Sequence, residues 1–262
     1  MPVAPFSLTV GPTASWSWPT RLGAVGRRIL NHILPMSCGA CGIRLTDDPL
    51  PFACRSCWAR IEPLPQPRCP RCGFPFASPV ALTYSPDHTC ATCRRRKPSY
   101  TRAWSLFPYE SPLRDLVHLL KYKNKMVLGS VLGRLMCKHL PAFPELDLVL
   151  PVPLGPYRLL EREYNQSLLL ADAIARAIGK PLDWSSLVRI RQTTPQTALP
   201  RRARLKNLRR TFAVARSGRI SGRRVLLVDD VFTTGTTVNE CAKTLRRAGS
   251  AEVYVVTLAR TL

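Results

Sequence analysis

Apolar and polar positions divide this chain into parts with different periodicity. Residues 36–98 are rich in cysteine, proline and arginine and show no steady spacing of apolar positions. From residue 102 onward, short apolar runs alternate with segments in which apolar residues recur every three or four positions. A consecutive apolar run predicts a buried strand, and the longer spacing predicts an amphipathic helix. Alternating strands and helices favour an α/β fold with a parallel, doubly wound sheet.

The two patterns locate the expected elements of this α/β part. Strands are predicted at residues 103–109, 147–152, 225–229 and 253–258. Helices are predicted at residues 112–122, 127–140 and 166–178, and a further helix has its apolar stripe at Val238, Cys241, Ala242 and Leu245. Ligands of doubly wound sheets bind beyond the carboxyl ends of the strands. The turns that follow Val152 and Asp230 are therefore the candidate binding turns.

No targeting segment is recognised at the amino terminus. Residues 1–20 contain no charged side chain and four prolines, so they are expected to form a disordered extension. Residues 20–34 predict an amphipathic helix whose apolar face holds Leu22, Val25, Ile29 and Ile33. The pair Arg27-Arg28 is similar to the start of a twin-arginine signal, but the apolar run after it is short and interrupted. No segment reaches the length of a membrane span.

The chain is expected to have three parts: an extension at 1–20, a module at 21–98 with the amphipathic helix and most cysteines, and an α/β domain at 99–262. Its 39 lysines and arginines stand against 16 acidic residues, a formal net charge of +23. Such a field favours polyanions such as nucleic acid, phosphate-rich ligands or an acidic membrane surface. A basic proteome with arginine-rich surface loops would give the same charge without any such partner.

Eight of the ten cysteines form Cys-x2-Cys pairs, namely Cys38/Cys41, Cys54/Cys57, Cys69/Cys72 and Cys90/Cys93. Two consecutive pairs offer four thiolates, so the spacing predicts two tetrahedral structural Zn2+ sites. Sequential sharing of the pairs is favoured, and interleaving stays open, as do redox dithiols or an iron–sulfur cluster. Cys137 and Cys241 are interpreted as buried apolar residues of helices. Zinc thiolates fit a reducing compartment, so a cytoplasmic location is expected.

One segment carries the clearest chemistry. The apolar run Val225–Val228 is followed by Asp229 and Asp230, then by the turn Thr233-Thr-Gly-Thr-Thr237 and a helix. Backbone N–H groups and the positive end of the helix converge on such a turn and favour a phosphate. The adjacent carboxylates suit sugar hydroxyls or Mg2+. Together they indicate a phosphorylated sugar, and an ordinary strand–turn–helix with a threonine cap is the alternative.

This segment resembles the phosphoribosyl pyrophosphate (PRPP) motif of the type I phosphoribosyltransferases. The resemblance implies that the two acids hold the ribose 2- and 3-hydroxyls and that the turn wraps the 5-phosphate, with Mg2+ bound beside PRPP. The implied PRPP-binding residues are Asp229, Asp230, Thr233, Thr234, Gly235, Thr236 and Thr237. The turn after Val152 matches the loop that grips pyrophosphate, where Arg158 and Arg162 offer forked donors to phosphate oxygens. Surface arginines are common in this chain, so an ordinary surface role is the alternative for both.

A wider set of residues resembles the ComF family, the competence protein F and gluconate-utilisation-associated group of phosphoribosyltransferase-like proteins. It comprises Lys121-Tyr122, Pro151-Val-Pro153, Arg162–Gln166 and, within one long segment, Arg189, Arg191, Thr193, Gln196, Leu199, Arg204, Asn207 and Phe212. The zinc module is also a family trait, and the resemblance runs from about residue 30 to the end. It implies a type I phosphoribosyltransferase-like doubly wound parallel sheet with a small N-terminal zinc-ribbon module.

One residue departs from that family pattern. Glu163 occupies the place of a glycine, and a carboxylate beside a pyrophosphate site would repel it unless it points away or pairs with Arg158. The segment Gln192–Arg210 is rich in arginine and lies between two core elements. It is expected to be a flap over PRPP, a surface for a nucleic-acid backbone, or a solvated loop.

Two functions follow from the resemblance. In the first, the domain binds PRPP or ribose 5-phosphate, and the zinc module and basic surfaces meet single-stranded DNA, or competence or DNA-processing proteins, during DNA uptake. In the second, the protein is an active phosphoribosyltransferase that moves a phosphoribosyl group from PRPP to a nitrogen acceptor. The sequence shows neither a clear acceptor pocket nor an assigned general base, and it leaves the oligomeric state open.

Overall fold

The computed structural model describes residues 36–46, 48, 50–78, 80, 85, 87–190 and 211–262. The expected extension at 1–20, the expected helix at 20–34 and the segment Gln192–Arg210 lie outside the described residues. Within the described part, no helix combines the length and the apolar character that crossing a bilayer requires.

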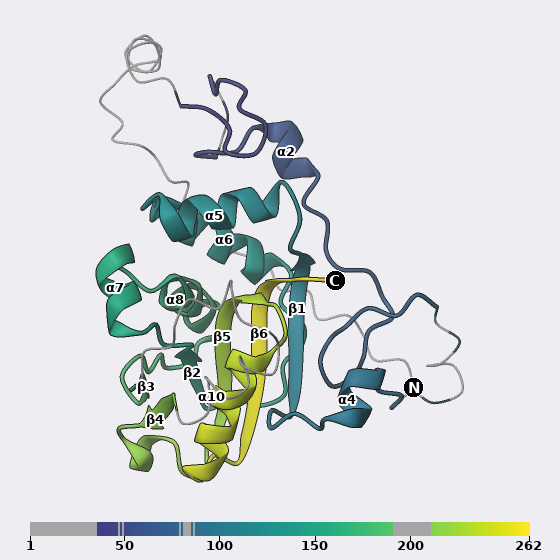
Figure 1. The fold of residues 1–262 in the computed structure, drawn as a ribbon, viewed down its shortest axis with the longest axis vertical. Coiled ribbons are helices and arrows are strands. Elements are labelled where there is room, and N and C mark those ends of the chain that lie inside the picture. Colours follow the sequence, from purple (N-terminus) through teal and green to yellow (C-terminus); the bar gives the residue numbers. More distant parts are fainter. Residues whose placement is uncertain are drawn as a thin grey trace.

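A parallel sheet forms the centre of the α/β domain (Figure 1). Its strands are β1 (Arg102–Pro108), β2 (Leu148–Pro151), β5 (Arg224–Phe232) and β6 (Glu252–Arg260), in the order β1-β6-β5-β2. All three neighbouring pairs run parallel, which confirms the predicted doubly wound architecture. The central strand β5 is longer than its apolar run predicts, because Asp229 and Val231 still pair in register with β6. The two acids therefore lie within the strand.

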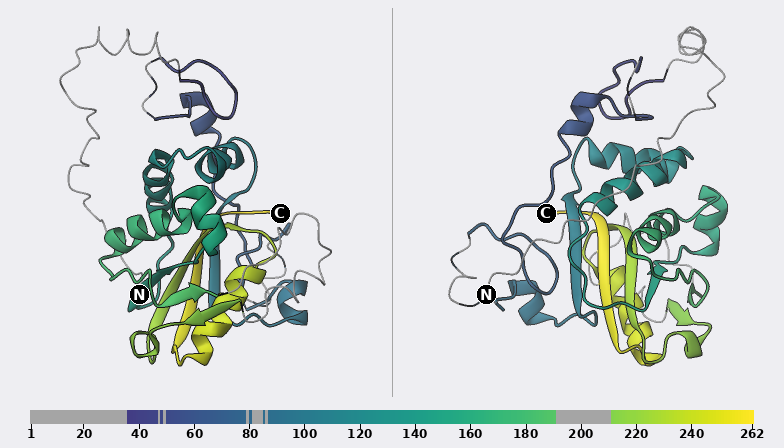
Figure 2. Two further views of the ribbon diagram at one scale, coloured as in Figure 1. Left: turned by 60° about the vertical axis from the view of Figure 1, so that its left-hand side comes forward. Right: turned by 180° about the vertical axis from the view of Figure 1, so that it is seen from behind.

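Helices cover both faces of this sheet (Figure 2). One face carries α5 (Leu113–Tyr122), α6 (Val127–Lys138) and α8 (Gln166–Ile178). The other carries α10 (Thr236–Arg247), beside the antiparallel pair β3 (Leu187–Arg189) and β4 (Phe212–Val214). Residues of β5 alternate between the two layers: Leu226 and Val228 pack in the core under α5 and α8, and Val225 and Leu227 pack in the core under α10. All four are fully buried, which explains their unbroken apolar run.

Several elements differ from the expected pattern. The helix α6 ends at Lys138, two residues before the predicted end at Leu140. The short helix α7 (Pro156–Arg162) and the pair β3–β4 were not predicted, nor was the 3-10 turn Ser217–Arg219. The sequence of α7 has no amphipathic stripe, and its apolar side chains are exposed, so periodicity does not predict this helix. The strands β3 and β4 are short and distant in sequence, so periodicity carries no signal for them.

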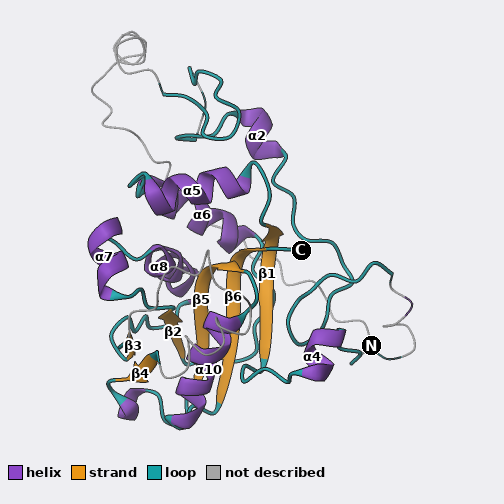
Figure 3. Cartoon of the chain, viewed as in Figure 1, coloured by secondary structure: helices purple, strands orange, loops and turns teal. Residues whose placement is uncertain are grey.

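The cysteine-rich module packs on the α/β domain at two places (Figure 3). The first cysteine set consists of Cys38, Cys41, Cys54 and Cys57, and the second of Cys69, Cys72, Cys90 and Cys93. The first set, with α2 (Arg55–Ala59), lies against α5, where a Cβ at Gly39 would come within 2.3 Å of Leu119 Cδ1. The second set, with α4 (Ala91–Arg95), lies beside β1. Ala103 N donates to Arg71 O at 2.9 Å, and Leu64 N donates to Leu106 O at 2.8 Å. These bonds occupy the outer edge of β1, which would otherwise present unpaired backbone groups.

Candidate functional site

The structure brings the cysteines of each consecutive set together. The four sulfur atoms of Cys38, Cys41, Cys54 and Cys57 lie within 4.8 Å of one another, as do those of Cys69, Cys72, Cys90 and Cys93. Cys41 Sγ lies 3.7 Å from Cys54 Sγ, and Cys72 Sγ lies 3.6 Å from Cys90 Sγ. A tetrahedron with Zn–S bonds of about 2.3 Å has edges of about 3.8 Å. Both sets therefore fit a structural zinc ion and share the pairs sequentially.

Local backbone geometry shapes the first pair of each set into a knuckle. Gly42 N donates to Cys38 O at 2.8 Å, and Gly73 N donates to Cys69 O at 2.9 Å. Both glycines have a positive φ, 76° and 69°, which other residues rarely adopt. In the first set, Cys54 caps α2, and its sulfur accepts a bond from Cys57 N. The sequence spacing and these turns together orient four thiolates toward one point.

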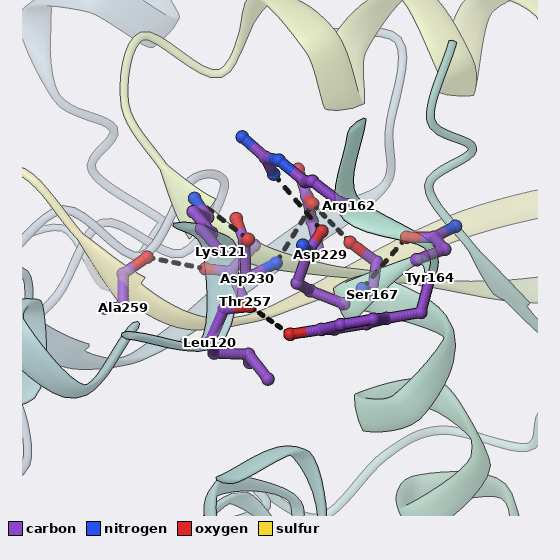
Figure 4. A network of polar contacts seen from close by, with 11 residues as sticks. Leu120, Lys121, Arg162, Tyr164, Ser167, Asp229, Asp230, Thr257 and Ala259 are labelled. Atoms are coloured by element: carbon purple, nitrogen blue, oxygen red, sulfur yellow. Dashed lines mark hydrogen bonds and ion pairs between the residues drawn. The ribbon is translucent and has the colours of Figure 1, made fainter. Parts of the chain in front are cut away.

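The two acids of β5 are held by side chains from two different helices (Figure 4). Ser167 Oγ, in the first turn of α8, donates to Asp229 Oδ1 at 2.8 Å. Lys121 Nζ, in the last turn of α5, lies 2.9 Å from Asp230 Oδ2. These contacts fix the orientation of both carboxyl groups at the carboxyl end of the central strand.

Lys121 is a site residue that the sequence indicates only through the resemblance to the ComF family. Its side chain is 15% exposed, and it follows the fully buried Val117 by four positions on the same helix face. A lysine that continues an apolar stripe must find an anionic partner, because a lone buried charge is costly. A lysine on the apolar face of a predicted helix therefore indicates a buried ion pair. The sequence pattern does not show which acid is its partner.

The surroundings raise the pKa values of both Asp229 and Lys121. Burial, followed by the charge of Asp230, raises the pKa of Asp229. Burial lowers the pKa of Lys121, but the attraction and the hydrogen bond of Asp230 outweigh it, so the net pKa is raised. Lys121 is therefore a stable cation paired with Asp230, and Asp229 holds a proton more readily than a carboxyl group in water.

The threonine turn follows directly from the end of β5. Gly235, the residue before α10, has a φ of 72°, and a Cβ there would lie 2.4 Å from the Phe232 ring. Only glycine satisfies both conditions. Thr234 Oγ1 lies 2.7 Å from Thr236 Oγ1, and Thr233 and Thr234 are exposed. The turn thus exposes threonine hydroxyl groups between the end of β5 and the first turn of α10.

Residues before α8 connect the end of β2, the start of α8 and the end of α5 around this site. Asn165 caps α8 by accepting from Ser167 N at 3.0 Å, and its Nδ2 donates to Val152 O at 3.0 Å. The hydroxyl of Tyr164 donates to Leu120 O, next to Lys121. Asn165 and Tyr164 therefore position the two side chains that hold the acids, Ser167 and Lys121.

The two arginines predicted to bind pyrophosphate have different environments. Arg162 is 6% exposed, lies 4.7 Å from the Tyr122 ring centroid and donates to Gln166 Oε1 at 3.2 Å. Arg158 is half-buried, and its charge, after the larger effect of burial, lowers the pKa of Arg189. The Arg189 side chain lies beside the start of α7, because a Cβ added at Gly155 would come within 3.5 Å of it. The guanidinium carbon of Arg189 lies 5.7 Å from the Phe212 ring centroid, so the strand pair β3–β4 holds this arginine.

Glu163 adopts a backbone conformation that favours glycine. Its φ is 64°, a left-handed value that follows the end of α7. Its exposed carboxylate lies within 3.5 Å of Asn124 Nδ2, on the turn after α5. Among the described residues, it forms no ion pair with Arg158. Pairing with Arg158 is thus not how the structure accommodates Glu163, whose carboxylate contacts Asn124.

Comparison with known proteins gives matches to both parts of the chain. A model of the phosphoribosyl transferase domain matches residues 165–262, and a model of the double zinc ribbon domain matches residues 29–94. The DNA utilization protein YhgH of Salmonella typhi is 35% identical over 200 residues, which cover 74% of this chain and 84% of the relative. Competence protein F of Haemophilus influenzae is 34% identical over 203 residues, which cover 74% of this chain and 85% of the relative. Competence protein ComFC of Streptococcus pneumoniae is 27% identical, over 60% of this chain and 67% of the relative.

Proposed function

Because this chain belongs to the ComF family, with a double zinc ribbon ahead of a phosphoribosyltransferase-like domain, we propose that the domain binds PRPP or a ribose 5-phosphate. The observation that carries the proposal is the shared position of Asp229, Asp230 and the turn Thr233–Thr237 at one end of β5. Carboxylates accept hydrogen bonds from a ribose diol, and the start of α10 offers N–H donors to the 5-phosphate. Ser167 and Lys121 hold the two carboxylates in place, so little ordering is needed when a sugar arrives.

The charge of the site indicates how Mg2+ takes part. Carboxylate oxygens suit Mg2+, and Asp229 and Asp230 are the residues that would hold it directly or through water. Lys121 offsets one of the two negative charges, and the pKa of Asp229 is raised. Such a weakly anionic pair is expected to hold Mg2+ only when a pyrophosphate supplies further oxygens. Mg2+ should therefore strengthen the binding of PRPP more than that of ribose 5-phosphate.

Calorimetric titration of the zinc-loaded protein tests this proposal. PRPP with Mg2+ is expected to bind, and ribose 5-phosphate is expected to bind with little dependence on Mg2+. Asp229→Asn with Asp230→Asn should abolish both signals, whereas Asp172→Asn, an exposed acid of α8, should leave them unchanged. Failure of the wild-type protein to bind either ligand would leave the domain as a scaffold without a ribose-phosphate site.

We propose that the macromolecular partner is single-stranded DNA or a DNA-processing protein, in a cytoplasmic role connected with DNA uptake. The support is the net charge of +23 and the names of the relatives, which are DNA utilization and competence proteins. Binding by charge releases counterions, so the affinity for single-stranded DNA should fall steeply with salt. A flat salt response would favour a protein partner.

Transfer of the phosphoribosyl group to a nitrogen acceptor is the second candidate function. The observation in its favour is the raised pKa of Asp229, since a carboxyl group that titrates nearer neutrality can exchange a proton during a reaction. Release of pyrophosphate from PRPP on addition of nitrogen acceptors would support transfer. Binding of PRPP without any pyrophosphate release across such a screen would favour the ligand-binding function.

A further inference from the structure

We infer that Arg260 is a positioning residue that couples the second zinc centre to the threonine turn, an inference that rests on the function proposed for that turn. Arg260 is the last residue of β6 and is 4% exposed. Its Nη1 donates a hydrogen bond of 2.8 Å to the carbonyl oxygen of Cys72, a member of the second cysteine set. Its guanidinium carbon lies 4.8 Å from the ring centroid of Phe232, which immediately precedes the turn.

The burial of Arg260 requires a negative charge nearby. Among the described residues, no carboxylate lies within ion-pair distance of Arg260, and its Nε has no hydrogen-bond partner. A buried guanidinium without a counter-charge is strongly unfavourable. Four thiolates around one Zn2+ carry a total charge of about −2. The second zinc centre is therefore the counter-charge beside which Arg260 can be buried.

Phe232 transmits the position of Arg260 to the turn. Its ring is 4% exposed and fills the place of a Gly235 side chain, because a Cβ there would lie 2.4 Å from it. The residue after Arg260 holds the same backbone: Thr261 N donates to Phe232 O at 3.1 Å, and Thr261 Oγ1 donates to Thr233 O at 3.4 Å. A shift of Arg260 would therefore loosen Phe232 and the start of the turn together.

The segment after the second cysteine set provides another link to the same turn. Tyr100 is 3% exposed, shares a core with Cys69, Cys72 and Cys93, and meets the Phe232 ring edge-on at 6.4 Å. Ser99 N donates to Asn239 Oδ1, in the first turns of α10, at 2.7 Å. The first cysteine set lies on α5 instead (Figure 1), so its zinc ion is not expected to support the turn.

Amide hydrogen exchange tests the coupling without any ligand. The informative peptide covers Phe232–Glu240, where Asn239 N donates to Gly235 O at 2.9 Å. Four zinc-treated proteins are compared: the wild type, Arg260→Met, Cys90→Ser in the second set and Cys41→Ser in the first set. Zinc content is measured in each, and Arg260→Met is expected to keep both ions. Exchange in this peptide should become roughly tenfold faster in Arg260→Met and Cys90→Ser, and should stay unchanged in Cys41→Ser.

Unchanged exchange in Arg260→Met and Cys90→Ser would overturn the coupling. Equal acceleration in Cys41→Ser would also overturn it, since zinc loss in general would then loosen the turn. If Arg260→Met does not fold, Arg260→Lys replaces it, because lysine keeps the charge and loses the flat guanidinium contact with the rings of Phe74 and Phe232. Titration of the same proteins with ribose 5-phosphate separates the two proposals. A wild type that binds neither ribose 5-phosphate nor PRPP with Mg2+ contradicts the proposed function, while the exchange rates decide the coupling by themselves.

Discussion

Lys121 and Asp230 form an ion pair of 2.9 Å that joins the last turn of α5 to the central strand β5, with both side chains largely buried. The pair places a cation within the candidate ribose-phosphate site and leaves Asp229 as the acid with the raised pKa. It also connects that site to the helix on which the first cysteine set packs.

Replacement of Lys121 tests this ion pair. Lys121→Met leaves Asp230 buried without its cation, so the free energy of unfolding should fall by roughly 2–4 kcal/mol, near the range for broken buried pairs. Adding Asp230→Asn should restore part of that loss, because the buried charge is then gone. Denaturant unfolding measures both effects. Arg176→Met, which breaks the exposed pair with Asp172, should cost less than about 1 kcal/mol.

The raised pKa of Asp229 makes stability depend on pH. Burial, and then the charge of Asp230, cause the folded protein to hold the proton of the Asp229 carboxyl group more tightly than the unfolded chain does. The resulting stability is present below the unfolded pKa of 3.8 and is lost as pH rises through the raised folded pKa. Asp229→Asn does not titrate, and its amide oxygen can still accept from Ser167. Relative to the wild type, its free energy of unfolding should rise by roughly 1–3 kcal/mol between about pH 4 and pH 8.

Urea unfolding of both proteins across that pH range gives the comparison. A stability difference that stays constant with pH would show that Asp229 titrates as it does in the unfolded chain.

Gly235 is expected to tolerate no side chain. Gly235→Ala places a methyl group 2.4 Å from the Phe232 ring, at a φ of 72° that alanine disfavours. Strain and displacement of the ring should lower the free energy of unfolding by roughly 1–3 kcal/mol and abolish binding of ribose 5-phosphate. Gly218→Ala is the matched control, because nothing lies within 4 Å of its Cβ. Wild-type affinity in Gly235→Ala would show that the turn does not bind the phosphate.

Metal analysis tests the cysteine sets. Cys54→Ser removes one thiolate from the first set and should reduce the zinc content from two ions per chain to one. The first zinc ribbon should then lose its fold, because four thiolates organise it in place of a large core. Cys137→Ser lies outside both sets and should retain two ions. Two ions in Cys54→Ser would mean that another ligand completes the site.

Glu163→Gly addresses the departure from the family pattern. Because Glu163 has a φ of 64° and its carboxylate lies near Asn124, glycine fits the backbone without strain. The affinity for PRPP with Mg2+ should change less than about twofold, since the site keeps its other charges. Calorimetric titration with PRPP and Mg2+ measures this change. An affinity at least tenfold higher in Glu163→Gly would show that the carboxylate of Glu163 repels the pyrophosphate.

The sequence by itself determined the features that depend on neighbouring residues. The predicted bounds of α8 agree with the structure, because Asn165 caps its start and Gly179, with a φ of 64°, ends it. The spacing of the cysteines favoured their sequential grouping, and the structure decided it by bringing each set of four sulfur atoms together. The acids and the threonine turn share one strand end because only two residues separate them in the chain.

Only the tertiary structure decided the contacts between distant segments. The continuation of β5 through both acids depends on its pairing with β6, which outweighs the local end of the apolar run. The pairing of Lys121 with Asp230, and the link from Arg260 to Cys72, join residues that are far apart in sequence. The periodicity of a helix or strand indicates that a charged side chain such as Lys121 is buried. Its partner becomes known only from the packed structure, because the cost of burying a charge depends on the groups around it.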